Sequence, residues 1–437
     1  MNENAEPDIA VADDITVKQT RRSKFRPTQL RGKVSVRQTF AALKHPNYRL
    51  WFWGQMISLF GSWMQTTAQA FFVYELTHSP AFLGYVGFAT GIPAWLFTFY
   101  AGVIADRHSR RKILMITQSW MMILAFILAL LTFTKIVQAW HIIILAFGAG
   151  IGNSFDAPSR QAFVNELVDR EDLINAIALN STMFNTATAV GPAVAGITYA
   201  LFGPAWCFTI NGISFLAVIY NLWRMKLKPL PGKTVKKSAL HELKDGFQYL
   251  KTQKMIYTII SIMAMISIFG MGLVTLFPAW AVRILQGDAT TNGLLQSARG
   301  IGAVSAALVI ASIINFVRKG KLLTTGFISL PILILIFSFN RTLFLSLFLL
   351  ILIGGALILV FNLANGTIQI LVSEEFRGRI MSIYSFSFFA LMPLGALLIG
   401  TEAEYFGSPI AILINALILL TLIIFINIRV PHLRKIE

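Results

Sequence analysis

From about residue 48 onward, the chain alternates between long apolar blocks and short polar segments. Most blocks hold roughly 20 residues, the length that a helix needs to cross a hydrocarbon layer about 30 Å thick. The apolar positions are continuous rather than alternating, which favours helices over a membrane β-barrel. We therefore predict an all-α membrane protein with twelve transmembrane helices, at residues 48–75, 80–105, 113–134, 139–160, 174–202, 204–224, 255–284, 292–316, 322–338, 342–372, 380–406 and 408–428.

Composition agrees with this pattern and excludes several classes of function. The 437 residues are 56% hydrophobic and only 13% charged, too few charges for the coat of a soluble domain. The net charge of +17 lies in short segments between apolar blocks, so we expect no nucleic-acid partner. The single cysteine, Cys207, can form neither an internal disulfide nor a metal cluster. Residues 1–43 are polar and basic, without the apolar core of a secretory signal, and are predicted to be a disordered tail.

The distribution of lysine and arginine predicts the orientation. Cytoplasmic segments of membrane proteins are enriched in these residues. Between the predicted spans, segments rich in them alternate with loops whose only candidates are Lys135, Arg283 and Arg341. The rich segments contain Arg21, Arg22, Lys24, Arg26, Arg31, Lys33, Arg37, Arg107, Arg110, Arg111, Lys112, Arg224, Lys226, Lys228, Lys233, Lys236, Lys237, Arg318, Lys319, Lys321, Arg377, Arg379, Arg434 and Lys435. We therefore predict a multi-pass plasma-membrane protein with both termini in the cytoplasm.

The two halves of the chain match each other in sequence. An offset of 209 residues pairs Gly84 with Gly293 and Gly91 with Gly300, and an offset of 204 pairs Gly191 with Gly395, Gly196 with Gly400 and Asn211 with Asn415. A parallel repeat of this kind is a transporter architecture, with the substrate site between the halves. We predict six-helix bundles at 44–224 and 255–429, a linker at 225–254 and a cytoplasmic tail at 430–437. The linker contains an amphipathic helix, which fits either a membrane-surface position or a solvated one.

The segment after the second predicted span carries a motif. It reads Gly-x-x-x-Asp-Arg-x-x-Arg-Arg, with Gly102, Asp106, Arg107, Arg110 and Arg111 at the defined positions. This motif resembles the cytoplasmic signature of the major facilitator superfamily. The segment 45–55, His-Pro-Asn-Tyr-Arg-Leu-Trp-Phe-Trp-Gly-Gln, is similar to the branch that includes the enterobactin exporter and drug and macrolide efflux proteins. The resemblance covers residues 44 to the end and implies that the motif latches the cytoplasmic side shut in the outward-facing state. Simple anchoring to lipid phosphates would explain the arginines but not Gly102 and Asp106.

A second motif lies in the fifth predicted span. Gly191, Pro192 and Gly196 resemble the Gly-Pro-x-x-x-Gly element of antiporter branches of this superfamily, which implies export rather than uptake. Independently of the resemblance, the proline bends the helix and the glycines allow another helix to approach. Ordinary packing of small residues is the alternative interpretation.

Polar residues inside the predicted spans indicate a substrate cavity. On the first span, polar side chains recur at steps of three and four residues, which places them on one helical face, at Gln55, Ser58, Ser62, Gln65 and Gln69. Polar groups facing lipid are costly, so this face should meet a cavity or another helix. Arg299 lies inside the eighth span, where we expect it to attract an anionic or polar part of a substrate. Snorkelling of Arg299 to the outer headgroups is the alternative.

No nucleotide-binding motif, nucleophile constellation or metal cluster is evident, so we expect neither an enzyme nor a cofactor. A proton gradient is the expected energy source. Asp156 is the candidate proton carrier because Arg160 lies one turn away and can modulate its pKa, and a fixed ion pair is the alternative interpretation. The sequence thus predicts a monomeric secondary transporter that exports drug-, macrolide- or siderophore-like amphipathic molecules by alternating access. A lysophospholipid or other lipid flippase and a non-transporting scaffold are the alternatives.

Overall fold

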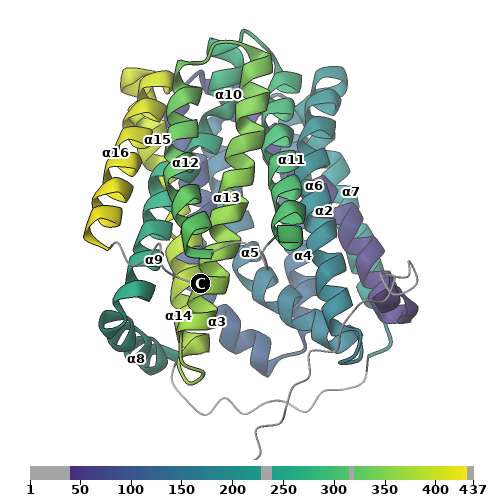
Figure 1. Ribbon diagram of the computed structural model, residues 1–437. Helices are drawn as coiled ribbons and strands as arrows, with labels where there is room; N and C mark the ends of the chain where they lie inside the picture. Colours follow the sequence, from purple (N-terminus) through teal and green to yellow (C-terminus); the bar gives the residue numbers. More distant parts are fainter. Residues whose placement is uncertain (1–39, 228–238, 314–318, 431–437) are drawn as a thin grey trace, which may run out of the picture. The chain divides into compact units, whose positions relative to one another are not determined.

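Every regular element in the described part of the structure is a helix (Figure 1). The computed structural model describes residues 40–227, 239–313 and 319–430. The first half contains η1 (Ala41–Lys44), α2 (Pro46–Thr77), α3 (Pro80–Arg107), α4 (Arg110–Phe133), α5 (Ala139–Leu167), α6 (Leu173–Phe202) and α7 (Pro204–Arg224). The remainder contains α8 (Ala239–Thr252), α9 (Lys254–Met265), η2 (Ile266–Gly270), η3 (Met271–Leu276), α10 (Phe277–Ala279), η4 (Trp280–Ile284), α11 (Ala289–Ile313), α12 (Lys319–Phe339), α13 (Leu343–Leu371), α14 (Arg377–Phe389), α15 (Met392–Phe406) and α16 (Ser408–Arg429).

The all-α prediction is confirmed, and each predicted span coincides with a helix or a run of helices. Nine helical segments of the described residues are long and apolar enough to cross a membrane. The helices α2, α5 and α6 are also long, at 32, 29 and 30 residues, but they carry more polar side chains. The exact count of twelve crossings stays a prediction. The two predicted tails fall largely on residues 1–39 and 431–437, outside the described part, while Ala41–Lys44 form a short 3-10 helix.

The sequence repeat recurs in the local backbone. Gly203 and Gly407, which are 204 residues apart, both adopt a positive φ, +85° and +83°. Each one separates two long helices, α6 from α7 and α15 from α16. A residue with a side chain adopts such a φ only at a cost, which explains glycine at both turns. A proline follows within the first two residues of the next helix, where its missing N–H has no partner to lose.

One of two close contacts between the halves joins α3 to α15. A Cβ atom added to Gly84 would lie 2.8 Å from the carbonyl oxygen of Ala396 and 3.3 Å from the Cα atom of Gly400. The backbones of the two helices therefore touch without intervening side chains. Van der Waals contact at small residues is a principal source of helix association in lipid, where the hydrophobic effect between helices is absent.

The other close contact joins α11 to α6 and repeats the same geometry. A Cβ atom on Gly293 would clash with the carbonyl oxygen of Pro192 and would lie 3.2 Å from the Cα atom of Gly196. Gly293 is the repeat partner of Gly84, and Gly196 is the partner of Gly400. The repeat in the sequence is thus also a repeat in three dimensions. Its matched glycines form both of these close backbone contacts between the halves.

The contacts between the halves are concentrated toward one end of the helices. We call the end at residues 108–109, flanked by Arg107 and Arg110, the basic end, and the end at residues 78–79 the opposite end. Hydrogen bonds between described residues of the two halves join Thr67 to Asn292 and Gln296, His78 to Arg283, Ser79 and Ala81 to Glu404, and Trp95 to Ala390. They lie at the opposite end or near the middle of the helices, and none lies at the basic end.

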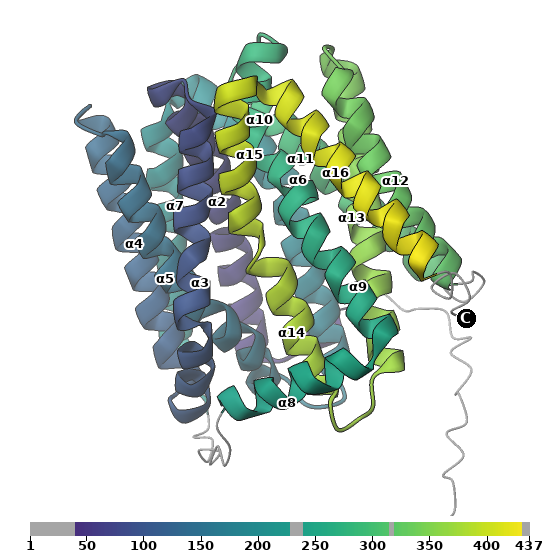
Figure 2. The ribbon, with the colours of Figure 1, turned by 90° about the vertical axis from the view of Figure 1, so that its left-hand side faces the viewer.

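A break divides α14 from α15 near the middle of the bundle (Figure 2). Pro393 in the first turn of α15 cannot donate a backbone hydrogen bond, which favours an interruption. Side chains bind two of the carbonyl groups near the break. Ser267 donates to the carbonyl of Phe388, and the indole Nε1 of Trp95 donates to the carbonyl of Ala390 at 2.6 Å. One donor comes from each half, so the break is stabilised from both sides.

The linker helix α8 packs against the beginning of α14, and Figure 2 shows it crossing that end of the bundle. Tyr249 stacks on Phe376 with ring centroids 4.3 Å apart, and Asp245 lies 3.8 Å from Arg379. A Cβ on Gly246 would lie 3.1 Å from the Arg379 side chain. In this structure, therefore, α8 packs against the second half through its side chains and is not connected to it by the backbone alone.

Filling the α11–α6 contact should destabilise the protein. In Gly293→Ala, the new methyl group meets the Pro192 carbonyl, and overpacking of this kind typically costs about 1–3 kcal/mol. We expect a lower melting temperature in detergent. Gly366→Ala on α13 is the matched control, since no described atom lies within 4 Å of its Cβ position. Equal melting temperatures for both variants would contradict the interface.

Candidate transport path and gates

The arginines of the basic end bind residues of their own half. Arg110 forms an ion pair with Glu166 on α5. Arg111 donates hydrogen bonds to the carbonyls of Trp223 at 2.7 Å and Met225 at 3.0 Å, at the C-terminus of α7. A cation there is favourable because helix C-termini carry partial negative charge. The cluster therefore links α4, α5 and α7.

The other three members of the motif are Gly102, Asp106 and Arg107, and the side chain of Arg107 is exposed. A Cβ atom on Gly102 would meet no described atom within 4 Å, so the predicted close approach of a neighbouring helix is not made here. The side chain of Asp106 lies outside the described part of the structure. The latch therefore stays a prediction.

The segment 45–55 anchors the start of α2. Asp172, at the N-cap of α6, lies 2.6 Å from Lys44 Nζ and 2.8 Å from His45 Nε2. The hydrogen bond from Lys44, and after it that from His45, lowers the pKa of Asp172 below its ordinary value of 3.8. Tyr48 adds a hydrogen bond from its hydroxyl to the carbonyl of Ala176 at 2.9 Å. These contacts explain physically why polar residues occur at the beginning of the segment.

Asp156 lies between α4 and α5 and is 1% exposed. Its carboxylate accepts hydrogen bonds from Thr117 Oγ1 at 3.0 Å and Gln118 Nε2 at 2.8 Å. Arg160 Nε lies 3.3 Å from the other oxygen, so the predicted pairing of Asp156 with Arg160 is present. A buried charge needs such partners in any case, so the role of Asp156 as a proton carrier stays a prediction.

The polar stripe of α2 divides into two groups. Gln65 accepts a hydrogen bond at 2.6 Å from Asn211 Nδ2 on α7, so it serves at least partly in helix packing. Gln55 and Ser58 are buried, whereas Ser62 and Gln69 keep part of their surface exposed. The cavity role predicted for the stripe therefore rests mainly on these last two residues.

The Gly-Pro element lies where α6 meets two other helices. A Cβ atom on Gly191 would be 2.8 Å from the Cβ of Trp63 on α2. A Cβ on Gly196 would be 2.7 Å from the carbonyl of Ala289 on α11. The element thus holds α6 against its own half through one glycine and against the other half through the second.

Arg299 lies on the face of α11 that meets α2. Asn292 and Gln296, seven and three residues earlier, are on the same helical face, and both bind Thr67. The Nε atom of Arg299 is buried and has no hydrogen-bond partner among the described residues. A Cβ on Gly354 would clash with the backbone of Arg299, so α13 packs directly behind it. An unpaired cation between α2 and α13 is a candidate site for an anion.

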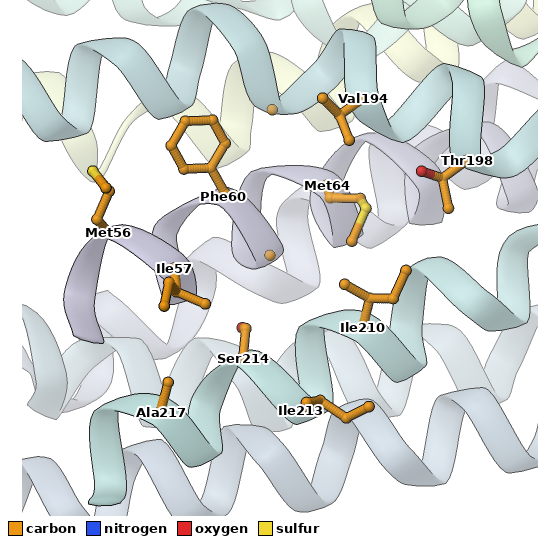
Figure 3. A pocket seen from close by; sticks show the side chains of 12 residues that line it. Met56, Ile57, Phe60, Met64, Val194, Thr198, Ile210, Ile213, Ser214 and Ala217 are labelled. Carbon is orange, nitrogen blue, oxygen red and sulfur yellow. The ribbon is translucent and has the colours of Figure 1, made fainter. Parts of the chain in front are cut away.

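A pocket of about 480 Å³ lies between α2, α6 and α7 (Figure 3). Its lining is almost wholly apolar and comprises Met56, Ile57, Phe60, Gly61, Met64, Gly191, Val194, Thr198, Ile210, Ile213, Ser214 and Ala217. Ile57, Val194 and Ile213 are exposed on the outer surface, which in a membrane protein faces lipid. Of the predicted site residues, the pocket includes Gly191 alone, so it is separate from the Arg299 region.

The sequence of the chain matches a known family of membrane proteins. Residues 37–437 match the family of transmembrane secretion effectors in the major facilitator superfamily. The chain belongs to this family. It is therefore a multi-pass membrane transporter and not an enzyme, as the sequence motifs predicted.

Relatives with known names are distant but match over most of the chain. The staphyloferrin A transporter of Staphylococcus aureus is 26% identical, over 82% of this chain and 90% of its own. Macrolide efflux protein A of Streptococcus pyogenes is 22% identical, over 90% and 98%. The enterobactin exporter of Escherichia coli is 24% identical, over 82% and 85%.

Solved structures agree on the fold. A bacterial homolog of the human lysosomal transporter Spinster, in an inward-facing and unoccupied conformation, superposes with a TM-score of 0.70. It is 12% identical, over 92% of this chain and 98% of its own. The nucleoside transporter NupG gives a TM-score of 0.67 at 17% identity, over 88% and 98%. At such identities the similarity shows the fold alone.

Glu166, Arg283 and Glu404 are among the charged residues that bind across helices and were not predicted as site residues. Glu166 forms an ion pair with Arg110 at the basic end. Arg283 and Glu404 belong to the second half and bind the turn at residues 78–79 of the first half. Arg283 could have been noticed because few cations lie in the loops of the opposite end. The two glutamates lie near helix ends, where a carboxylate in a sequence is usually solvated.

The contact of Asp172 with Lys44 and His45 should be visible in the pH dependence of stability. Asp172→Asn should melt at a lower temperature than the wild type at neutral pH. Because the pKa of Asp172 is lowered in the folded protein, this stabilisation is fully present above its ordinary value and disappears as the pH falls through the folded-state pKa.

The difference in melting temperature should therefore shrink below about pH 4. Asp169→Asn is the control, since that carboxylate is exposed and lies 4.0 Å from the His45 ring. A difference that stayed constant down to the acid limit would show that the Asp172 charge is not responsible.

Proposed function

We propose that this transporter exports small amphipathic molecules from the cytoplasm by alternating access, as a monomer driven by the proton gradient. The observation that carries the proposal is the one-sided contact between the halves. They are joined by hydrogen bonds and backbone contacts toward the opposite end, and none of the hydrogen bonds between described residues of the two halves lies at the basic end. The lysine and arginine distribution assigns the basic end, with both termini, to the cytoplasm. The conformation then corresponds to an exporter ready to load its substrate.

The substrate class follows from Arg299 and from the relatives. The Nε atom of Arg299 is buried without a partner among the described residues, and a cation inside a membrane is costly unless an anion or water meets it. Arg299 therefore favours substrates with a carboxylate or another anionic group. The relatives named above carry siderophores and a macrolide. We infer that the substrate is amphipathic, with an anionic part that binds Arg299 and an apolar part that contacts the aromatic and aliphatic surfaces of the helices.

Export assays on Arg299 variants test whether an anionic part of the substrate binds this residue. Arg299→Gln should lower the export of an anionic amphipathic compound about tenfold, equivalent to about 1.4 kcal/mol of lost binding, while affecting a neutral dye less. Arg299→Lys should retain part of the activity because it retains the charge. Lys135→Gln, which removes an exposed cation from the loop between α4 and α5, is the control. Unchanged export of the anionic compound by Arg299→Gln would exclude this site.

The proton-coupling role of Asp156 needs a separate experiment. Asp156→Asn should abolish gradient-driven export in vesicles but leave the exchange of labelled for unlabelled substrate, which needs no net proton movement. Thr117→Val is the control, because it removes one hydrogen bond to the carboxylate and keeps the charge. Loss of both activities together with a lower melting temperature would assign Asp156 to structure instead.

One observation favours the alternative of a lipid flippase. The apolar pocket between α2, α6 and α7 is bordered by side chains that face lipid, and its size and lining suit an acyl chain. Movement of a fluorescent lysophospholipid between leaflets of proteoliposomes would separate the two functions. We expect no acceleration over empty vesicles for an exporter of soluble amphipathic compounds.

A further inference from the structure

The two-residue turn between α2 and α3 receives both a cation and a carboxylate from the other half. Arg283 on η4 donates a hydrogen bond from its NH2 group to the carbonyl of His78, at 2.5 Å. Glu404 on α15 accepts hydrogen bonds from the hydroxyl of Ser79 at 2.6 Å and the backbone N–H of Ala81 at 3.2 Å. Both contacts lie at the opposite end, where the halves meet.

Each charge lies at the helix terminus that favours it. His78 is the C-cap of α2, and its carbonyl lies at the partially negative end of that helix, where a cation is stabilising. Arg283 is also placed over the ring of Tyr74 in the last turn of α2, at 5.8 Å from its centroid. Glu404 lies at the partially positive start of α3, where a carboxylate is stabilising.

The N-terminus of α3 depends on the other half for its cap. Ser79 is the N-cap residue, yet its side chain makes no capping hydrogen bond to its own helix. It donates to Glu404 instead, and the same carboxylate oxygen accepts the free N–H of Ala81. A helix end that would ordinarily be capped locally is therefore completed only while the halves are in contact.

The repeat shows that the fold does not require this arrangement. The residue equivalent to Ser79 is Asp288, which caps its own helix by accepting the N–H of Thr291 at 3.0 Å. The residue equivalent to Glu404 is Ala200, and the one equivalent to Arg283 is Tyr74. Ser79, Arg283 and Glu404 thus all differ from their equivalents in the repeat.

We propose that Arg283, Glu404 and Ser79 form a clasp that holds the opposite end shut and must release before the transporter opens there. Both charged side chains are exposed, so each one stabilises the closed state only modestly. Modest stabilisation suits a contact that has to break in every transport cycle. The clasp supplies at the opposite end a counterpart to the latch predicted at the basic end. It rests on the alternating-access part of the proposed function, and not on the substrate, the coupling ion or the direction of transport.

A buried reporter cysteine can measure the opening. Thr67 is 1% exposed and lies at the contact between α2 and α11, so Thr67→Cys should react with a membrane-impermeant maleimide only when the opposite end opens. The one native cysteine, Cys207, is buried and would be replaced by alanine to remove background. Labelling is followed in proteoliposomes without substrate or gradient.

Glu404→Ala and Arg283→Gln should each raise the labelling rate about threefold, and the double variant about tenfold, because each removes one exposed interaction from the closed state. Alanine is the residue that the repeat itself has at the position equivalent to Glu404, so the helix tolerates it. Ser79→Ala, a milder change, should raise the rate about twofold.

Asp288→Ala is the matched control, since it removes a helix cap at the equivalent turn without touching the other half. It should leave the labelling rate at the wild-type value. The clasp is wrong if the Glu404 and Arg283 variants label at the wild-type rate, or if Asp288→Ala accelerates labelling equally. Vesicles in which the protein has a known orientation show from which side the label reaches Thr67→Cys. The test of the clasp is then independent of the proposed direction of transport. Labelling from the cytoplasmic face would reverse the predicted topology and leave the clasp intact.

Discussion

The structure depends on direct backbone contact between its halves at two pairs of glycines. In lipid, apolar side chains gain nothing by leaving one hydrocarbon environment for another, so helices associate through close packing and polar contacts. Gly84 with Gly400, and Gly293 with Gly196, bring two pairs of helices together at the backbone. Because the repeat relates the pairs, both contacts have one geometry. Both contacts lie toward the opposite end, so an opening of that end would have to separate them.

Within this matched frame, the residues proposed for anion binding and for the clasp depart from the repeat. Arg299, Glu404 and Arg283 correspond to Thr90, Ala200 and Tyr74 in the first half. The matched positions, by contrast, are mostly glycines or turn residues whose role is to bring backbones together or to reverse the chain. The glycines that both halves share therefore serve the packing of the helices. The proposed clasp and the proposed anion site use residues that only one half has.

Much of the fold could be predicted from the sequence because membrane helices are specified locally. An apolar stretch of sufficient length must be helical, and Gly203 and Gly407 mark their turns by residue type alone. The pairing of Asp156 with Arg160 was predictable for the same reason, since it needs only the spacing of one helical turn. Contacts that join distant segments were not predictable in this way. Gln65 looks like a cavity residue until Asn211 is placed beside it, and Glu404 looks like a solvated side chain until the turn at 78–79 approaches.

The break between α14 and α15 has a consequence for how the protein changes shape. The carbonyls of Phe388 and Ala390 near the break are bound by Ser267 from the second half and by Trp95 from the first. If the halves turn against each other, the indole must leave Ala390, and in a medium without water the abandoned carbonyl has to find another donor at once. Intermediate angles therefore carry an unsatisfied polar group and are unfavourable. This favours two discrete arrangements with a barrier between them over a continuous swing, so that the membrane is less often left with an open path through the protein.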